Sequence, residues 1–227
     1  MQMEDIKAVI FDLDDTLYPQ IEYTRQSLLA SAPYIAEISG CGVEIVNENL
    51  NIILGWHGIE YKRIYDDLFE AISFDGKPYL QDILKLFRGC KPKISAYQNV
   101  YKVLDELNVS YRLGMITDGY EEAQKYKINE LNLNDYFEKV LITDTLGIEN
   151  RKPSSVPYEK LLEIMELAAN ECVYVGNDPR KDFIACKKLG MKSVRIKQGD
   201  YKNLVLDQEY EADYCVDDII NLLDIIN

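Results

Sequence analysis

Short runs of apolar residues recur along the chain, each too brief for a helix and each followed by polar residues. The first covers residues 8–11. It predicts a buried strand, because no polar side chain within it marks a solvent-facing side. Similar runs, which predict further strands, cover residues 111–116, 140–143, 172–175, 193–196 and 214–216.

Helical periodicity fills the spaces between these runs. Apolar residues stand at i, i+3, i+4 and i+7 from Val100 and again from Tyr158, which is the spacing of a helix with one apolar face. Residues 184–189 predict another helix, which ends at Gly190. Strands that alternate with helices form βαβ units with right-handed crossovers. The sequence therefore predicts an α/β fold, a Rossmann-like, doubly wound parallel sheet.

One stretch interrupts the alternation of strands and helices. Between residues 19 and 93 no run predicts a buried strand, and apolar residues such as those in 64–72 follow a helical spacing. Residues 90–93 read as a linker back to the sheet. We therefore predict two domains: a core domain of residues 1–18 and 94–227, and a helical domain of residues 19–93 inserted after the first strand.

Composition and charge restrict the function. The chain has 227 residues, of which 47% are hydrophobic, so it is long and apolar enough to bury a core. Its net charge is −14, from 25 basic and 39 acidic residues. This charge argues against nucleic acid or an anionic membrane surface as the main partner. It also means that an anionic substrate needs a cation in the site, and a bound metal ion is the simplest one.

Cysteine and histidine usage excludes several kinds of site. The number of cysteines, five, is odd, and no CxxC motif occurs. A disulfide framework or a zinc site is therefore not expected, and a reducing cytoplasm fits best. No apolar signal region or membrane-spanning stretch is visible. His57 is the single histidine, which makes a Ser-His-Asp or multi-histidine metal mechanism hard to build.

Paired aspartates follow the first predicted strand, and ligands bind at the carboxyl ends of strands in open parallel sheets. Of Asp12 and Asp14, one carboxylate can attack phosphorus and the other can protonate the leaving oxygen. Two anions this close resist ionisation and repel a phosphate. Mg²⁺ removes both difficulties, since it prefers oxygen ligands. The alternative is an acidic turn that merely ends a strand.

The next two strand ends carry a hydroxyl group and an ammonium group. Thr117, Asp118 and Gly119 follow the second strand, where a hydroxyl and backbone N–H groups can hold a phosphate oxygen. The alternative is an ordinary Asp-Gly turn. After the third strand, Pro153 fixes the backbone beside Lys152, whose ammonium can offset the charge of a nucleophile and a phosphoryl group. The alternative is a solvated lysine.

Oxygen-bearing side chains gather after the fourth predicted strand. Asn177, Asp178 and Asp182 lie where a metal ion would need a third protein ligand. Alternatively, Asp178 before Pro179 caps the start of a helix.

Taken together, these four strand ends resemble the haloacid dehalogenase-like hydrolase superfamily. Its hallmarks are a DxDx[TV] strand end, a later Ser/Thr, a Lys, and a GDxxxD or GDxxxxD motif. The resemblance spans residues 6–196, and residues 11–19, FDLDDTLYP, are close to the family's phosphatase form. It implies a Mg²⁺-dependent phosphatase that hydrolyses small phosphate monoesters, such as a sugar phosphate or nucleotide, through an aspartyl-phosphate. It also implies that the helical insertion is a C1-type cap that opens and closes over a small phosphorylated metabolite.

Roles follow from the resemblance residue by residue. Asp12 is implied to be the nucleophile and a metal ligand. Asp14 is implied to be the general acid/base, with a backbone carbonyl that also binds the metal. Thr117 is implied to hold the transferring phosphoryl group, and Lys152 to orient Asp12 and offset charge. Asp182 is implied to bind the metal, directly or through water, or to support its ligands.

One position departs from the family pattern. The family usually has Asp after the glycine of the last motif, whereas this chain has Asn177. A neutral amide oxygen can bind Mg²⁺ but supplies less charge. Alternatively Asp178 takes the ligand role, since Asp178 and Asp182 keep a DxxxD spacing.

The cap is expected to select the substrate. Within residues 56–63, His57, Lys62 and Arg63 are candidates to meet an anionic or sugar-like leaving group. The alternatives are that His57 is a turn residue and that the two basic residues belong to a solvated helix face.

Two other functions compete with the phosphatase. A phosphomutase would use the same aspartyl-phosphate but return the phosphoryl group to substrate. A weakly active binding or regulatory protein would fit the presence of Asn177 but not the intact Asp12, Asp14 and Lys152. A dehalogenase is disfavoured, since dehalogenases of the superfamily lack the second aspartate of the first motif, and Asp14 is present.

Overall fold

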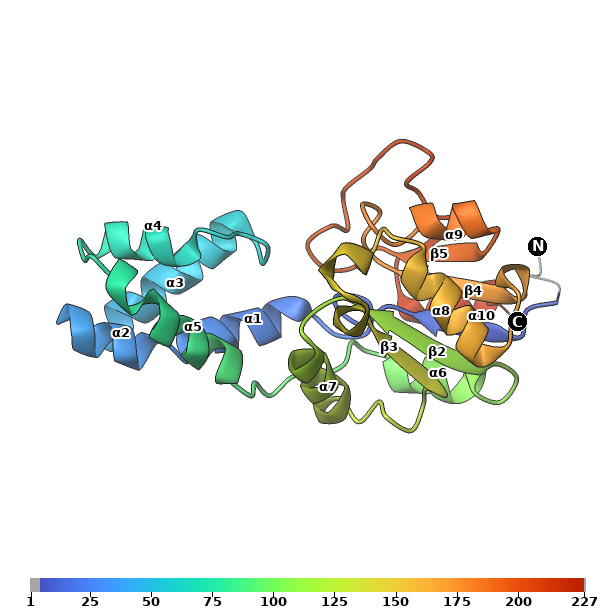
Figure 1. Ribbon diagram of the computed structural model, residues 1–227, viewed down its shortest axis with the longest axis horizontal. Coiled ribbons are helices and arrows are strands. Elements are labelled where there is room, and N and C mark those ends of the chain that lie inside the picture. Colours follow the sequence, from blue (N-terminus) through green and yellow to red (C-terminus); the bar gives the residue numbers. More distant parts are fainter. Residues whose placement is uncertain (1–4, 227) are drawn as a thin grey trace. The chain divides into compact units, whose positions relative to one another are not determined.

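The computed structural model describes residues 5–226, and its core is a single parallel sheet. In this part of the chain six strands lie in the order β3-β2-β1-β4-β5-β6. Figure 1 labels β2, β3, β4 and β5. All neighbouring strands pair in parallel. The strands are β1 (Ala8–Phe11), β2 (Arg112–Thr117), β3 (Lys139–Ile142), β4 (Cys172–Gly176), β5 (Lys192–Ile196) and β6 (Tyr214–Val216). The predicted α/β fold with a doubly wound parallel sheet is confirmed.

The predicted strands form, and for the central ones burial explains the apolar pattern. Each predicted run forms a strand whose bounds differ from the prediction by at most one residue. All four residues of β1 are completely buried. This strand lies between β2 and β4 in the middle of the sheet, so both of its faces are covered and neither tolerates a polar side chain.

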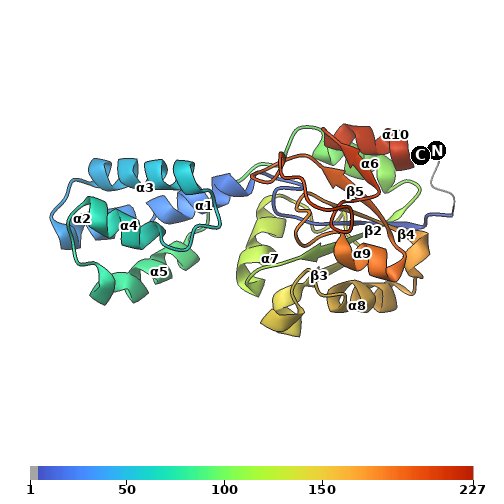
Figure 2. The ribbon, with the colours of Figure 1, turned by 90° about the horizontal axis from the view of Figure 1, so that it is seen from above.

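Helices cover both faces of the sheet. In Figure 2, α8 and α9 lie on one face, and α6 and α10 lie on the other. Side chains of β1 alternate between the faces, so Ala8 and Ile10 join the cluster of buried residues under α8 and α9. The helices of this unit are α6 (Val100–Leu107), α7 (Glu121–Glu130), α8 (Val156–Met165), α9 (Ile184–Leu189) and α10 (Leu222–Ile226). The three helices expected from periodicity and the Gly190 stop all form.

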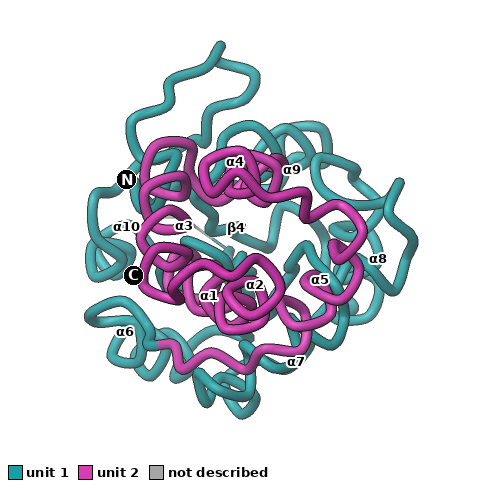
Figure 3. The backbone as a smooth tube through the Cα atoms, turned by 90° about the vertical axis from the view of Figure 1, so that its left-hand side faces the viewer, with its two compact units in different colours: residues 1–19, 95–227 teal, residues 20–94 magenta. Residues whose placement is uncertain are grey.

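The chain divides into two compact units, coloured separately in Figure 3. One comprises residues 1–19 and 95–227, and the other is Gln20–Ile94. No strand falls within residues 20–94. This helical unit has an apolar core of its own, which includes Ile35, Leu50 and Leu68. Its helices are α1 (Gln20–Leu29), α2 (Ala32–Ser39), α3 (Val43–His57), α4 (Ile64–Ala71) and α5 (Leu80–Gly89). No helix among the described residues is long and apolar enough to span a membrane.

The strand order fixes where chemistry can gather. The chain runs outward from β1 in one direction through β2 and β3, and in the other through β4, β5 and β6. Such a reversal leaves a crevice at the carboxyl ends of the central strands. The register aligns Phe11 of β1 with Met115 of β2 and with Val175 of β4. Residues that follow these three strands therefore meet at one edge.

Candidate active site

Asp12 occupies the centre of this edge. It follows β1 directly, and its backbone N–H donates to the carbonyl of Val175 at 2.9 Å, which continues the strand pairing by one residue. The residue is 1% exposed. Its Oδ1 accepts a hydrogen bond from Lys152 Nζ at 2.7 Å, and its Oδ2 accepts one from Thr16 Oγ1 at 3.3 Å. The carboxylate is therefore held from both sides.

Lys152 is a buried cation and not a solvated lysine. Its side chain is 0% exposed. Besides Asp12, Nζ donates to Asp182 Oδ1 at 2.8 Å and to Tyr174 Oη at 3.0 Å. An ammonium group has three donor hydrogens, and here each has a protein acceptor. The orientation of this side chain relative to Asp12 is thus fully determined by the fold.

Asp118 ties the loops after β2 and β3 together. Its Oδ1 accepts hydrogen bonds from Thr143 Oγ1 at 2.7 Å and from the backbone N–H of Lys152 at 3.2 Å. The carboxylate therefore holds the backbone from which Lys152 projects. Gly119 adopts φ +138°, a backbone conformation that residues with a side chain rarely adopt. A Cβ atom there would lie 3.1 Å from the Gln124 side chain.

Asp14 is held by α7. Its Oδ1 accepts hydrogen bonds from Lys127 Nζ at 2.7 Å and from the Tyr18 hydroxyl. Its Oδ2 accepts one from Gln124 Nε2 at 2.9 Å. Burial acts to raise the pKa of Asp14, but the Lys127 charge and these hydrogen bonds outweigh it and hold the pKa below its usual value. Gln124 Nε2 also donates to Thr117 Oγ1 at 2.5 Å.

The sequence reasoning missed Gln124 and Lys127. They were visible as polar residues on the inner face of a helix, since the buried residues of α7 are Gln124, Lys127 and Ile128. A helix whose inner face is polar needs buried partners. The two polar residues on the buried face of α7 indicate partners in the site only when the helix is known to lie beside the strand ends.

Asn177 lies beside Asp12. The Thr16 hydroxyl that is 3.3 Å from Asp12 Oδ2 is also 3.3 Å from Asn177 Oδ1. A hydroxyl has one hydrogen to donate, so it is shared between these two oxygens. Asn177 is 2% exposed. The amide oxygen and the carboxylate therefore converge on one buried point.

Asp178 is engaged elsewhere. Its Oδ1 accepts from the backbone N–H of Arg180 at 3.0 Å and from Arg180 Nε at 2.9 Å, and its Oδ2 accepts from an Arg180 terminal nitrogen at 2.7 Å. The alternative that Asp178 caps a helix is wrong, because the next helix, α9, begins at Ile184. The side chain closes a turn instead.

Asp182 supports the loop after β4. Its Oδ2 accepts from the backbone N–H groups of Asn177 at 3.1 Å and Asp178 at 2.9 Å, while its Oδ1 accepts from Lys152. A Cβ atom at Gly176 would lie 2.6 Å from Asp182 Oδ2. The glycine is therefore needed for the close approach of this carboxylate to the loop.

The pKa values of the two carboxyl groups that share Lys152 are shifted in opposite directions. Burial raises the pKa of Asp12 to about 7; the Lys152 charge opposes this rise and the Asp182 charge adds to it. Burial also favours the protonated form of Asp182, but Lys152, Lys181 and hydrogen bonds outweigh it and hold the pKa of Asp182 below its usual value. A divalent cation beside Asp12 would favour its ionised form.

The donor set fits a hard cation. Among residues 5–226, no three His, Cys, Asp or Glu side chains are grouped as metal ligands. Asp178 is paired with Arg180, and Asp182 is paired with Lys152. What remains beside Asp12 is the amide oxygen of Asn177. A carboxylate, an amide oxygen and backbone carbonyls are the ligands that Mg²⁺ takes together with water.

His57 and Arg63 belong to the helical unit. His57 is the last residue of α3, and its ring stacks on Tyr61 with centroids 4.0 Å apart. The Arg63 side chain is 65% exposed, with nitrogens 3.9 Å from Asp66 Oδ2 and 3.6 Å from Asp67 Oδ1. Both residues thus have partners within their own unit.

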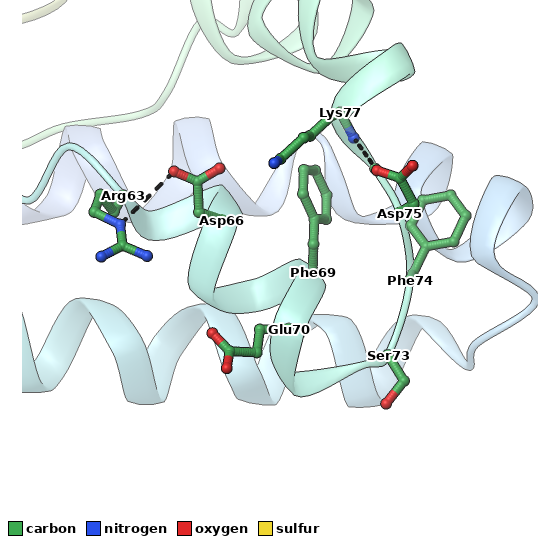
Figure 4. A pocket seen from close by; sticks show the side chains of 9 residues that line it. Arg63, Asp66, Phe69, Glu70, Ser73, Phe74, Asp75 and Lys77 are labelled. Atoms are coloured by element: carbon green, nitrogen blue, oxygen red, sulfur yellow. Dashed lines mark hydrogen bonds and ion pairs between the residues drawn. The ribbon is translucent and has the colours of Figure 1, made fainter.

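A pocket of about 530 Å³ lies beside Arg63 on the helical unit (Figure 4). Its charged side chains are mixed: Arg63 and Lys77 are basic, whereas Asp66, Glu70 and Asp75 are acidic. A phosphate dianion would meet more negative than positive charge there. The pocket is therefore a poor phosphate site.

Known proteins are similar to this chain in sequence and in fold. The sequence profile described as haloacid dehalogenase-like hydrolase matches residues 9–196. The glyceraldehyde 3-phosphate phosphatase of Methanocaldococcus jannaschii is 33% identical over 97% of each chain. The Pyrococcus furiosus protein of the same name is 30% identical over 99% of this chain and 94% of its own. The solved structure of the putative HAD-hydrolase YfnB from Bacillus subtilis has a TM-score of 0.72 at 13% identity, covering 99% of this chain and 100% of that one.

The chain therefore belongs to the haloacid dehalogenase-like hydrolases, the family that its strand-end motifs resemble.

Proposed function

We propose that this phosphoric monoester hydrolase is a Mg²⁺-dependent enzyme that cleaves small phosphate monoesters through an aspartyl-phosphate on Asp12. The observation that carries the proposal is the setting of Asp12. One of its oxygens is held by the buried Lys152 ammonium at 2.7 Å, and the other shares the Thr16 hydroxyl with Asn177 Oδ1. A fixed carboxylate beside a cation, at the crevice of a parallel sheet, is suited to nucleophilic attack on phosphorus.

The reaction has two balanced steps. In the first, a carboxylate oxygen of Asp12 forms a bond to phosphorus while the bond to the leaving oxygen breaks, and Asp14 in its protonated form gives that oxygen a proton. In the second, Asp14 takes a proton from a water molecule, whose oxygen attacks phosphorus and releases inorganic phosphate and free Asp12. Lys152 orients Asp12 throughout, and the buried Thr117 hydroxyl is proposed to hold a phosphoryl oxygen.

The metal site is proposed to use Asp12, the Asn177 amide oxygen and the backbone carbonyl of Asp14. When bound, Mg²⁺ supplies positive charge that offsets the phosphate and the ionised Asp12. Asp182 is proposed to support this site by fixing the backbone of Asn177. Asp118 and Gly119 are proposed to shape the loop that presents backbone N–H groups to the phosphate.

Glyceraldehyde 3-phosphate is the first substrate to test. The two archaeal relatives that carry its name are 33% and 30% identical to this chain over nearly its full length. We also propose that the helical unit, residues 20–94, acts as the cap that selects among monoesters. Exchange of this unit for that of a relative with another substrate should change the order of preferred substrates and leave hydrolysis of a small aryl phosphate in place.

The test measures inorganic phosphate released from glyceraldehyde 3-phosphate and from a panel of phosphorylated metabolites. Asp12→Asn should lower kcat by about 10³-fold or more, because the nucleophile is lost. Asp135→Asn, which changes an exposed aspartate of the same unit, should have no effect. EDTA should stop turnover and Mg²⁺ should restore it. Retained turnover in Asp12→Asn removes the nucleophile from the proposal, and indifference to EDTA removes the metal.

A further inference from the structure

The inner face of α7 is polar where the fold would ordinarily require apolar side chains. Gln124 is 1% exposed and Lys127 is 5% exposed. They stand three residues apart, so both lie on the same side of the helix. Burial of an ammonium or an amide is unfavourable unless each finds a partner. Their partners are residues of the proposed active site.

Both oxygens of the Asp14 carboxylate are held from this face. Lys127 Nζ donates to Oδ1 at 2.7 Å, and Gln124 Nε2 donates to Oδ2 at 2.9 Å. The Tyr18 hydroxyl donates to Oδ1 as well. Donors on both oxygens fix the plane of a carboxylate as well as its position. The position and plane of the Asp14 carboxyl group are therefore set largely by α7.

Gln124 also connects Asp14 to the residue proposed to hold the phosphoryl group. Its amide nitrogen donates to Thr117 Oγ1 at 2.5 Å as well as to Asp14 Oδ2. An amide nitrogen has two hydrogens, so both bonds can form together. One side chain thus links the proposed proton donor to the proposed phosphoryl ligand.

We infer that Gln124 and Lys127 are positioning residues that aim the Asp14 carboxyl group at the leaving oxygen. The inference rests on the proposed function, because it requires that Asp14 act as the general acid. A general acid works only within hydrogen-bond reach of the oxygen that it protonates, and a displacement of about 1 Å costs on the order of 10²-fold in rate. Neither residue need touch the substrate to have this effect.

The leaving group supplies a test that a merely structural role would not satisfy. Phenyl phosphate has a poor leaving group that needs a proton, whereas 2,4-dinitrophenyl phosphate has a good one that leaves without it. We expect Gln124→Leu and Lys127→Met to lower kcat/KM for phenyl phosphate by about 10- to 100-fold, and for the dinitrophenyl ester by less than about threefold. The value of kcat/KM reports the steps up to and including formation of the aspartyl-phosphate.

A matched control lies on the same helix. Lys125 also sits on α7, but its side chain is 65% exposed and pairs with Glu121. Lys125→Met also removes one positive charge from α7, and it should leave kcat/KM for both esters unchanged. Circular dichroism checks that each variant is folded. If Lys127→Met fails to fold, Gln124→Leu carries the test, because it removes no charge.

A double-mutant cycle completes the design. In an Asp14→Asn background, Gln124→Leu should lose most of its effect on phenyl phosphate, and any remaining effect through its hydrogen bond to Thr117 should be equal for the two esters. Equal losses for both esters, or no loss for either, would overturn the inference while the phosphatase proposal stands. A wild-type protein that hydrolyses neither ester with Mg²⁺ present would overturn the phosphatase proposal and the inference together.

Discussion

Replacement of Lys152 by methionine tests the electrostatic basis of the site. The Lys152 side chain is 0% exposed, and its two carboxylate partners, Asp12 and Asp182, are 2% and 0% exposed. Methionine has a similar length and fills a similar space, but it donates no hydrogen bond and carries no charge. Lys152→Met therefore leaves two buried carboxylates without their shared cation.

The expected loss of stability follows from this burial. Removal of one partner from a buried ion pair costs about 3–5 kcal/mol, because the remaining charge is not compensated. We expect a decrease of about 4 kcal/mol in the free energy of unfolding of Lys152→Met at pH 8, without metal.

The loss should depend on pH in a defined direction. Burial favours the protonated form of Asp182, and Lys152 is the strongest influence that opposes it. Without Lys152 the folded-state pKa of Asp182 should rise above its unfolded value. A carboxyl group with a raised pKa stabilises the fold at low pH, and this contribution is lost as pH rises. One proton is worth about 1.4 kcal/mol per pH unit, so the penalty should be smaller at pH 6 than at pH 8 by up to about 3 kcal/mol.

The assay is urea unfolding followed by far-ultraviolet circular dichroism at pH 6, 7 and 8 in EDTA. Lys160→Met is the control, because Lys160 lies on α8 with a side chain that is 46% exposed and pairs with Glu163. An exposed pair of this kind contributes about 0.5 kcal/mol or less, with little dependence on pH. If Lys152→Met lies within about 1 kcal/mol of wild type, or if its penalty is the same at pH 6 and pH 8, the reasoning about a shared buried cation is wrong.

Three further predictions concern the metal ligands and one loop. Asn177→Asp should tighten Mg²⁺ binding by about tenfold and Asn177→Ala should weaken it by a similar factor; calorimetry that finds no change in either would place the metal elsewhere. Burial raises the pKa of Asp12 to about 7, so Mg²⁺ must displace a proton from Asp12 at lower pH. The Mg²⁺ affinity, measured from pH 5 to 8, should therefore rise by up to about tenfold per pH unit and level off above pH 7. An affinity that does not change with pH would contradict this. Gly199 and Gly190 have φ values of +67° and +74°, but only at Gly199 would a Cβ atom overlap the Asp15 carboxyl group. Gly190→Ala should therefore lower the free energy of unfolding, measured by thermal denaturation, by about 1 kcal/mol, and Gly199→Ala should lower it by about 2–4 kcal/mol. Equal decreases would show that Asp15 moves aside.

The sequence by itself determined the sheet and the positions of its strand ends. Central strands such as β1 are buried on both faces, so they must be apolar throughout, and such runs stand out in the chain. The residue that follows each run lies at the carboxyl edge whatever the order of the strands. Asp12, which follows β1, and Thr117, which ends β2, could therefore be recognised as candidates before any contact was known. Lys152 lies ten residues beyond the end of β3, so its role was indicated by the resemblance to the family.

Only the tertiary structure decided which side chains meet. Asn177 and Asp178 are neighbours in the chain, yet Asn177 shares a hydroxyl with Asp12 while Asp178 pairs with Arg180. Lys127 is a residue of a polar helix in the sequence, and in the fold it contacts Asp14, 113 positions away. The physical reason is that periodicity reports only which side of an element is buried. The partner of a buried polar group depends on strand order and helix placement, which bring distant residues within hydrogen-bond reach.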